Sequence, residues 1–108
     1  MPFFSTRNVP FRQKRAGVQM KAFSGSQIQM TIVQLEPGFI SSHTHPEEQI
    51  GYILSGEMEM SIGEEKMNCA HGDGYSIPGG MLHSVRVTSD QPVELLEIFS
   101  PPKEENRI

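Results

Sequence analysis

Three histidines and one glutamine in this chain have the types and spacing of a metal site. His43 and His45 are two residues apart, and alternate residues of an extended strand point to the same face, so both imidazoles can bind one ion. Gln49 follows a Pro-Glu-Glu turn and offers its amide oxygen, and His83 adds a third imidazole. A mixed nitrogen and oxygen set suits a catalytic divalent metal ion, and nickel, zinc, iron, manganese and copper all tolerate it.

A carboxylate and a lysine near the end of the chain are candidates for proton transfer and anion binding. The face formed by residues 93, 95, 97 and 99 of an expected strand is apolar apart from Glu97. If this face lines the interior, desolvation raises the pKa of Glu97 toward values useful for acid and base chemistry, whereas the opposite register leaves Glu97 solvated. Lys103 either holds a substrate carboxylate or ends the chain in water.

The elements that must position these residues are short strands. Runs of alternating apolar and polar residues between glycine and proline turns predict about eight to ten strands and no helix. Apart from the strand of the histidine pair, they cover residues 18–23, 28–32, 49–55, 58–62, 65–70, 75–77, 82–87 and 93–99. After Ile32 the apolar residues change face, which predicts either a bulge or a strand covered on both sides. The pattern is that of an all-β antiparallel sandwich or barrel.

The chain has the length of one domain with a single small core. We expect an N-terminal arm at 1–17, a barrel at 18–100 and a tail at 101–108, whose two prolines cannot continue a central strand. The arm either packs its aromatic residues on the barrel or on a second subunit, with its basic residues in solvent, or uses these cations to attract an acidic substrate. Exposed sheet edges and the aromatic arm predict a homodimer.

Charge and composition exclude several classes of protein. The chain has 9 Lys and Arg against 13 Asp and Glu, a formal net charge of −4, and so lacks the basic excess of a general nucleic-acid binder. No apolar run has the length of a signal-peptide core or a membrane span, so we expect a soluble, cytoplasmic protein. Cys69 is the single cysteine, which excludes an internal disulfide and agrees with a reducing compartment.

Two motifs give the chain a resemblance to the cupin superfamily. The first cupin motif is matched by Gly38, His43, His45, Gln49 and Gly56. The second is matched by Gly72, Pro78, Gly80 and His83. The resemblance implies the cupin double-stranded β-helix, an RmlC-like jelly-roll barrel. Gln49 stands where cupins usually have Glu, and a neutral ligand leaves more of the ion's charge uncompensated, which favours an anionic substrate.

A narrower resemblance is to small single-domain cupins of the KdgF type, which ketonise unsaturated uronates. The stretch from His43 to Tyr52 and the stretch from Glu97 to Lys103 are similar to segments of that family. The resemblance implies that Glu97 stands for a catalytic Asp, Phe99 for a substrate-binding Phe and Lys103 for an Arg. Both charged positions keep their sign but change their length and geometry.

These observations lead to one preferred function and two alternatives. We expect a metal-dependent enzyme of isomerase or lyase type that acts on a small anionic sugar or enol, with ketonisation of an unsaturated uronate as the most specific form. The first alternative is a dioxygenase that uses the same ion. The second is a cupin that binds a sugar without turnover.

Overall fold

The computed structural model describes residues 2–107, and these form ten β-strands and two short 3₁₀ helices. One sheet has six strands in the order β1 (Arg12–Arg15), β2 (Val18–Ser24), β3 (Gln29–Leu35), β10 (Val93–Ser100), β5 (Glu48–Ser55) and β8 (Gly74–Ile77). The other sheet has four, in the order β4 (Ile40–His43), β9 (His83–Val87), β6 (Met58–Ile62) and β7 (Glu65–Cys69). The 3₁₀ helices are η1 (Thr6–Asn8) and η2 (Glu104–Asn106).

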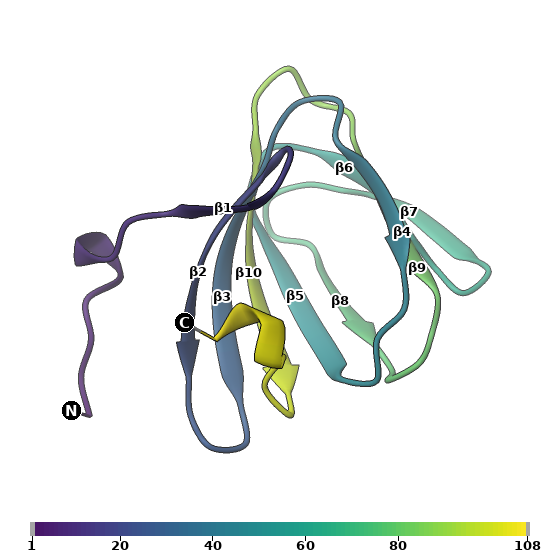
Figure 1. The fold of residues 1–108 in the computed structure, drawn as a ribbon. Helices are drawn as coiled ribbons and strands as arrows, with labels where there is room; N and C mark the ends of the chain where they lie inside the picture. Colours follow the sequence, from purple (N-terminus) through teal and green to yellow (C-terminus); the bar gives the residue numbers. More distant parts are fainter. Residues whose placement is uncertain (1, 108) are drawn as a thin grey trace.

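The two sheets face each other and enclose the interior of a barrel (Figure 1). Every pairing between these strands is antiparallel. This confirms the expected all-β fold, and the strands that the sequence predicts are present with small shifts at their ends. Within the described residues, no helix is long and apolar enough to cross a bilayer.

The inner faces of the strands change from apolar at one end of the barrel to polar at the other. On β10, Val93 and Leu95 are buried in the core, and the inward positions that follow are Glu97 and Phe99. The apolar end is filled by residues from both sheets, namely Val18, Met20, Val33, Leu35, Ile53, Met58, Met60, Cys69, Ile77, Val87, Val93 and Leu95. Burial of these side chains holds the sheets together and leaves the opposite end for polar residues.

The inner face of strand β3 also changes from apolar to polar, and the expectation of a bulge in this strand is wrong. Its pairing with β2 and β10 runs without a register shift, so β3 has no bulge at Ile32. Gln29 and Thr31 are completely buried on the inner face, while Met30 and Ile32 lie on the outer face and are partly exposed. The apolar residues change face because the inner face of β3 becomes polar toward the end of the barrel that holds the histidines.

The first residues of the chain extend away from the barrel before they join it (Figure 1). Of the proposed arm at 1–17, residue 1 lies outside the described residues, and residues 12–15 are strand β1, paired with β2. Phe4 stacks on Phe23 of β2 with ring centroids 4.5 Å apart, whereas Phe3 is exposed. The expectation that the basic residues lie in solvent is wrong for Lys14, whose side chain is only 12% exposed.

The tail folds back onto the barrel through η2 (Figure 1). Asn106 is completely buried, and its Nδ2 donates a hydrogen bond to Oε1 of Gln29 (3.1 Å), while Nε2 of Gln29 donates to the backbone oxygen of Lys103 (3.1 Å). Lys103 is therefore buried, and the interpretation that it ends the chain in water is wrong. Residue 108 of the proposed 101–108 tail lies outside the described residues.

Candidate metal centre

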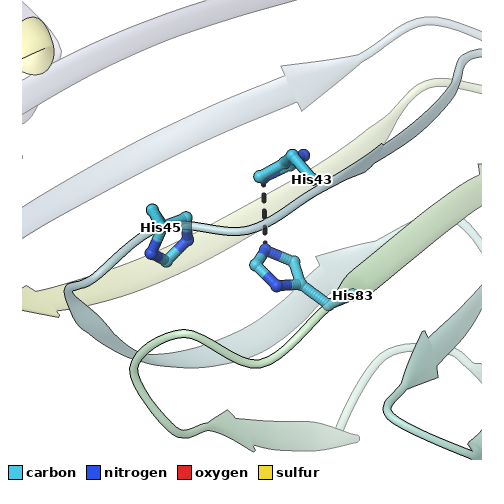
Figure 2. A group of neighbouring side chains, drawn as sticks. All are labelled: His43, His45 and His83. Atoms are coloured by element: carbon cyan, nitrogen blue, oxygen red, sulfur yellow. Dashed lines mark hydrogen bonds between the residues drawn. The ribbon is translucent and has the colours of Figure 1, made fainter.

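The three predicted histidines meet between the sheets. His43 at the end of β4 lies opposite His83 at the start of β9, and their Nε2 atoms are 3.2 Å apart. His45 follows β4, and its ring centroid lies 4.9 Å from that of His83. One ring nitrogen from each residue lies within 4.8 Å of the others. Figure 2 shows the three rings turned toward one another.

A tight contact between two loops fixes this arrangement. Gly80 donates its backbone N–H to the carbonyl of His45 (2.8 Å). A Cβ atom added to Gly79 would lie 2.3 Å from the carbonyl oxygen of Pro46, so only glycine allows this approach. The loop before His83 is thus held against the loop that contains His45, which explains why a glycine pair precedes the third histidine.

Backbone carbonyls orient two of the imidazoles. Nδ1 of His45 lies 3.0 Å from the carbonyl oxygen of Glu47, and Nδ1 of His83 lies 3.0 Å from that of Met81. A carbonyl only accepts, so these contacts assign the proton to Nδ1 and leave the lone pair of Nε2 directed at the centre. Such outer hydrogen bonds fix the tautomer that binds a metal.

The site also favours uncharged imidazoles. Burial, followed by the neighbouring His83, lowers the pKa of His43 to about 4, and burial lowers the pKa of His83 as well. Nδ1 of His43 is buried without a hydrogen-bond partner in the described structure. Neutral imidazole is the form that binds transition metals, so no proton has to be displaced from His43 near neutral pH.

Gln49 of β5 completes a set of four donor atoms. Its Nε2 donates to Oε2 of Glu97, which directs its Oε1 toward Nε2 of His45 at 3.0 Å. With the proton of His45 on Nδ1, this places two acceptor atoms in contact, and the contact becomes favourable when a cation or a proton lies beside them. The donor set of His43, His45, His83 and Gln49 therefore fits a divalent transition ion.

Glu97 lies at one end of a row of three residues on neighbouring strands. It pairs with Gly51 of β5, and Gly51 pairs with Tyr75 of β8. A Cβ atom on Gly51 would lie 2.2 Å from Cζ of Tyr75, so the missing side chain lets the phenol cross β5 and donate to Oε2 of Glu97 (2.7 Å). Burial raises the pKa of Glu97, against the opposing effects of Tyr75, Lys103 and Gln49.

Phe99 and Lys103 form the wall beside the histidines. The buried ring of Phe99 has its centroid 5.7 Å from that of His45. Nζ of Lys103 lies 5.4 Å from the Phe99 centroid and 2.9 Å from Oε1 of Glu105. The ammonium is thus held by one carboxylate and the face of one aromatic ring.

The structure brings all seven predicted residues to one cavity of about 90 Å³. This volume is several times the roughly 10–15 Å³ that one water molecule needs, so the cavity can admit a small molecule. Tyr75 and Asn106 also line the cavity and were not among the sequence candidates. The glycine at the inward position 51 is the sequence signal for Tyr75, because it leaves space for a large neighbour, whereas Asn106 has no local signal.

Comparison with known proteins identifies the family. Residues 31–99, more than half of the chain, match the family described as "Cupin domain". The chain is 28% identical over 104 residues to the pectin degradation protein KdgF of Dickeya dadantii, with 94% of each covered. An uncharacterised protein of Streptomyces coelicolor is 27% identical over 63 residues, which span 58% of this chain and 59% of that protein.

A solved structure supports the same fold. The structure of KdgF from Halomonas sp. has a TM-score of 0.87 with this chain at 22% identity, and 97% of each chain is covered. The antiparallel barrel described above, with its histidines between two sheets, agrees with this likeness over nearly the whole length. The chain therefore belongs to the cupin-domain family, and its barrel is the cupin double-stranded β-helix.

Proposed function

We propose that this cupin is a metal-dependent enzyme that ketonises a small anionic enol, with an unsaturated uronate as the most specific substrate. The observation that carries the proposal is the position of Glu97, a carboxyl group of raised pKa beside three histidines in one cavity. Similarity to a pectin degradation protein along 94% of the chain supports the choice of a sugar acid.

The metal would be held by His43, His45, His83 and Gln49. When bound, a divalent ion supplies Lewis-acid chemistry that withdraws electron density from a substrate oxygen. Three neutral imidazoles and a neutral amide leave the charge of the ion uncompensated, which favours an anionic ligand beside it. Gln49 has a second role in the proposal, because its Nε2 also fixes the carboxyl group of Glu97.

Glu97 would transfer the proton. Ketonisation moves a proton from the enol oxygen to the neighbouring carbon, while the C=C bond becomes a C–C bond and the C–O bond becomes C=O. Protonated Glu97 can give its proton to the carbon and then receive the proton of the hydroxyl group, so no net charge remains. Tyr75 and Gln49 hold Oε2 of Glu97 and leave Oε1 available for this exchange. Acid and base catalysis of this kind contributes about 10²–10⁴-fold to a rate.

Phe99 and Lys103 would bind the substrate. The Phe99 ring lies near both His45 and Lys103, and its apolar face can pack on a sugar ring and exclude water. The Lys103 ammonium can contact the substrate carboxylate. A ligand held in this way spans the cavity from the lysine to the histidines.

A second copy of the chain is part of the proposal. The outer face of the six-stranded sheet has an apolar hollow lined by Ile50, Tyr52, Leu96 and Ile98, and Ile50 is 54% exposed. The same face of a second chain would bury this surface and complete a homodimer. The cavity that contains the histidines lies on the other side of this sheet, so the dimer would leave it accessible.

The test of the reaction is the loss of the ultraviolet chromophore of a lyase-generated unsaturated monouronate. We expect the metal-loaded protein to accelerate this loss, the metal-stripped protein to lack the effect, and Glu97→Gln to lose about 10²-fold or more of the rate while it still binds the metal. Lys66→Met, a change at an exposed lysine on the other sheet, is the control and retains the full rate.

Two outcomes would count against the proposal. If metal-loaded and metal-stripped protein remove the chromophore equally slowly, a uronate is not the substrate. If Glu97→Gln retains the full rate, another group transfers the proton. Oxygen uptake coupled to turnover would instead favour the dioxygenase alternative.

A further inference from the structure

A β-bulge in the first strand directs a lysine into the cavity. Gln13 pairs with Gln19 and Arg15 pairs with Val18, so two steps along β1 match one step along β2 and Lys14 is the extra residue. A bulge of this kind turns consecutive side chains toward the same side, and bulges are common next to active sites. Lys14 and Arg15 accordingly both line the cavity.

The Lys14 ammonium is fixed in this position. Its Nζ donates to Oδ1 of Asn106 at 2.7 Å, and the Asn106 amide cannot turn freely because its Nδ2 donates to buried Gln29. The Lys14 side chain is 12% exposed, and that of Lys103 is 8% exposed. Both lysines are tied to the same carboxylate, since Glu105 lies 2.9 Å from Lys103 and 3.8 Å from Lys14.

The charges around the cavity are unbalanced. The described lining residues include three cations, Lys14, Arg15 and Lys103, against a single carboxyl group, Glu97. The Glu105 side chain that contacts both lysines is 55% exposed and does not line the cavity. Burial, and then the charge of Lys103, lowers the pKa of Lys14 to about 8. Burying cations together is costly, and an anion bound between them would offset this cost.

We propose that Lys14 and Lys103 form a two-lysine subsite that binds the carboxylate of a small sugar acid, with the rest of the ligand directed toward the histidines. The inference rests on the proposed function for the class of ligand. A single ammonium is a point charge and lacks the planar fork with which arginine contacts both oxygens of a carboxylate. Two lysines from opposite ends of the chain can contact one oxygen each. Strand β1 is then part of the binding site.

Calorimetric titration with two stable hexoses tests this subsite. D-Galacturonate carries a carboxylate where D-galactose carries a hydroxymethyl group, and neither has the enol that ketonisation requires. We expect metal-loaded protein to prefer galacturonate, and Lys14→Met to weaken galacturonate binding by about tenfold or more, as expected for loss of a charge-assisted contact. Binding of galactose should not change, and Lys14→Arg should recover part of the affinity for galacturonate.

Lys66→Met is the matched control, because it removes the same charge from an exposed position and should leave both affinities unchanged. The inference is overturned if the wild-type protein does not prefer galacturonate, if Lys14→Met binds galacturonate as the wild type does, or if Lys14→Met weakens both sugars equally, which would indicate a structural role.

Failure of the two-lysine subsite is distinguishable from failure of the proposed function. If galacturonate binding depends on Lys14 but the unsaturated uronate is not turned over, the subsite is supported and the proposed reaction is wrong. If the uronate is turned over but galacturonate binding does not depend on Lys14, the reaction is supported and the subsite is wrong. Thermal unfolding of each variant confirms that the compared proteins are folded.

Discussion

At the scale of single residues, the four histidines provide an internal control. Three of them line the cavity, while His71 lies in an exposed turn away from it. We expect the wild-type protein to bind one divalent ion per chain and His83→Ala to bind it more than about 100-fold more weakly, because loss of a ligand costs more than loss of a supporting hydrogen bond. Equilibrium dialysis followed by elemental analysis measures this.

The variant His71→Ala should retain the full ion content. Equal loss of metal from His71→Ala and His83→Ala would mean that the ion binds through the surface of the protein and not at the three-histidine centre.

The lowered pKa of His43 also predicts how the metal-free protein responds to acid. The pKa is about 4 in the folded state, against an ordinary value of 6.5. Between these values the unfolded chain binds the proton and the folded chain does not, so the free energy of unfolding falls as the pH drops from about 6.5 toward 4. His83, whose pKa is also lowered, acts in the same direction.

Urea denaturation at a series of pH values, after treatment with a chelator, measures this effect. We expect the stability of His43→Gln to fall less steeply with acid than that of the wild type, because the variant no longer has this group to protonate. Parallel curves for the two proteins would show that His43 is not the residue responsible.

At the scale of elements, the Gly51 and Tyr75 pair decides whether β8 can support Glu97. A methyl group at position 51 would overlap the Tyr75 ring, with its carbon 2.2 Å from Cζ. We expect Gly51→Ala to lower the free energy of unfolding by about 1–3 kcal/mol, as overpacked residues do. Chemical denaturation measures the cost.

Gly25→Ala is the comparison, because its added carbon would lie at an ordinary 3.5 Å from Ile28 and position 25 lacks a positive φ. It should change the stability far less. In a Tyr75→Ala background, Gly51→Ala should have almost no further cost, since the overlapping ring is gone. If Gly51→Ala lowers the free energy of unfolding by the full amount in that background, the strain does not come from contact with the Tyr75 ring.

The elements also show which features a sequence can predict. The relative positions of residues close in the chain, such as His43 and His45, can be predicted from the two-residue period of a strand. The strands themselves can be predicted from the alternation of apolar and polar residues. Tyr75 could not be predicted in this way, because its direction depends on a glycine in a neighbouring strand. The position of Lys14 could not be predicted either, because only the pairing of β1 with β2 reveals the extra residue.

The sequence could not predict which face of β3 points into the barrel, for a related reason. A period of two identifies two faces but not which of them points inward, and Gln29 and Thr31 look like surface residues. Inside the barrel, Gln29 is satisfied by Ser24 and by residues of the tail more than 70 positions away. Contacts at such separation leave no local pattern in the sequence.

At the scale of the whole molecule, the outer face of the six-stranded sheet predicts the oligomeric state. We expect the protein to be a dimer by multi-angle light scattering, and Ile50→Glu to shift it to a monomer, because two like charges would meet in the apolar hollow. Met67→Glu is the matched control, since Met67 is 53% exposed on β7 of the other sheet and should leave the dimer intact.

A wild-type monomer at micromolar concentration would remove the proposed dimer. If Ile50→Glu remains dimeric, the chains associate through another surface, and the aromatic residues of the N-terminal segment, Phe3 and Phe4, are the next candidates.

The phenol that crosses β5 has a consequence for how this barrel can evolve. An enlarged residue at position 51 destabilises the barrel unless position 75 has become small, and a small residue at 75 leaves a void unless 51 then grows. The two sites should therefore change as a pair across descendants of this sequence. A directed-evolution library that randomises one of them at a time would yield destabilised variants at both, whereas joint randomisation would allow new shapes of the cavity wall.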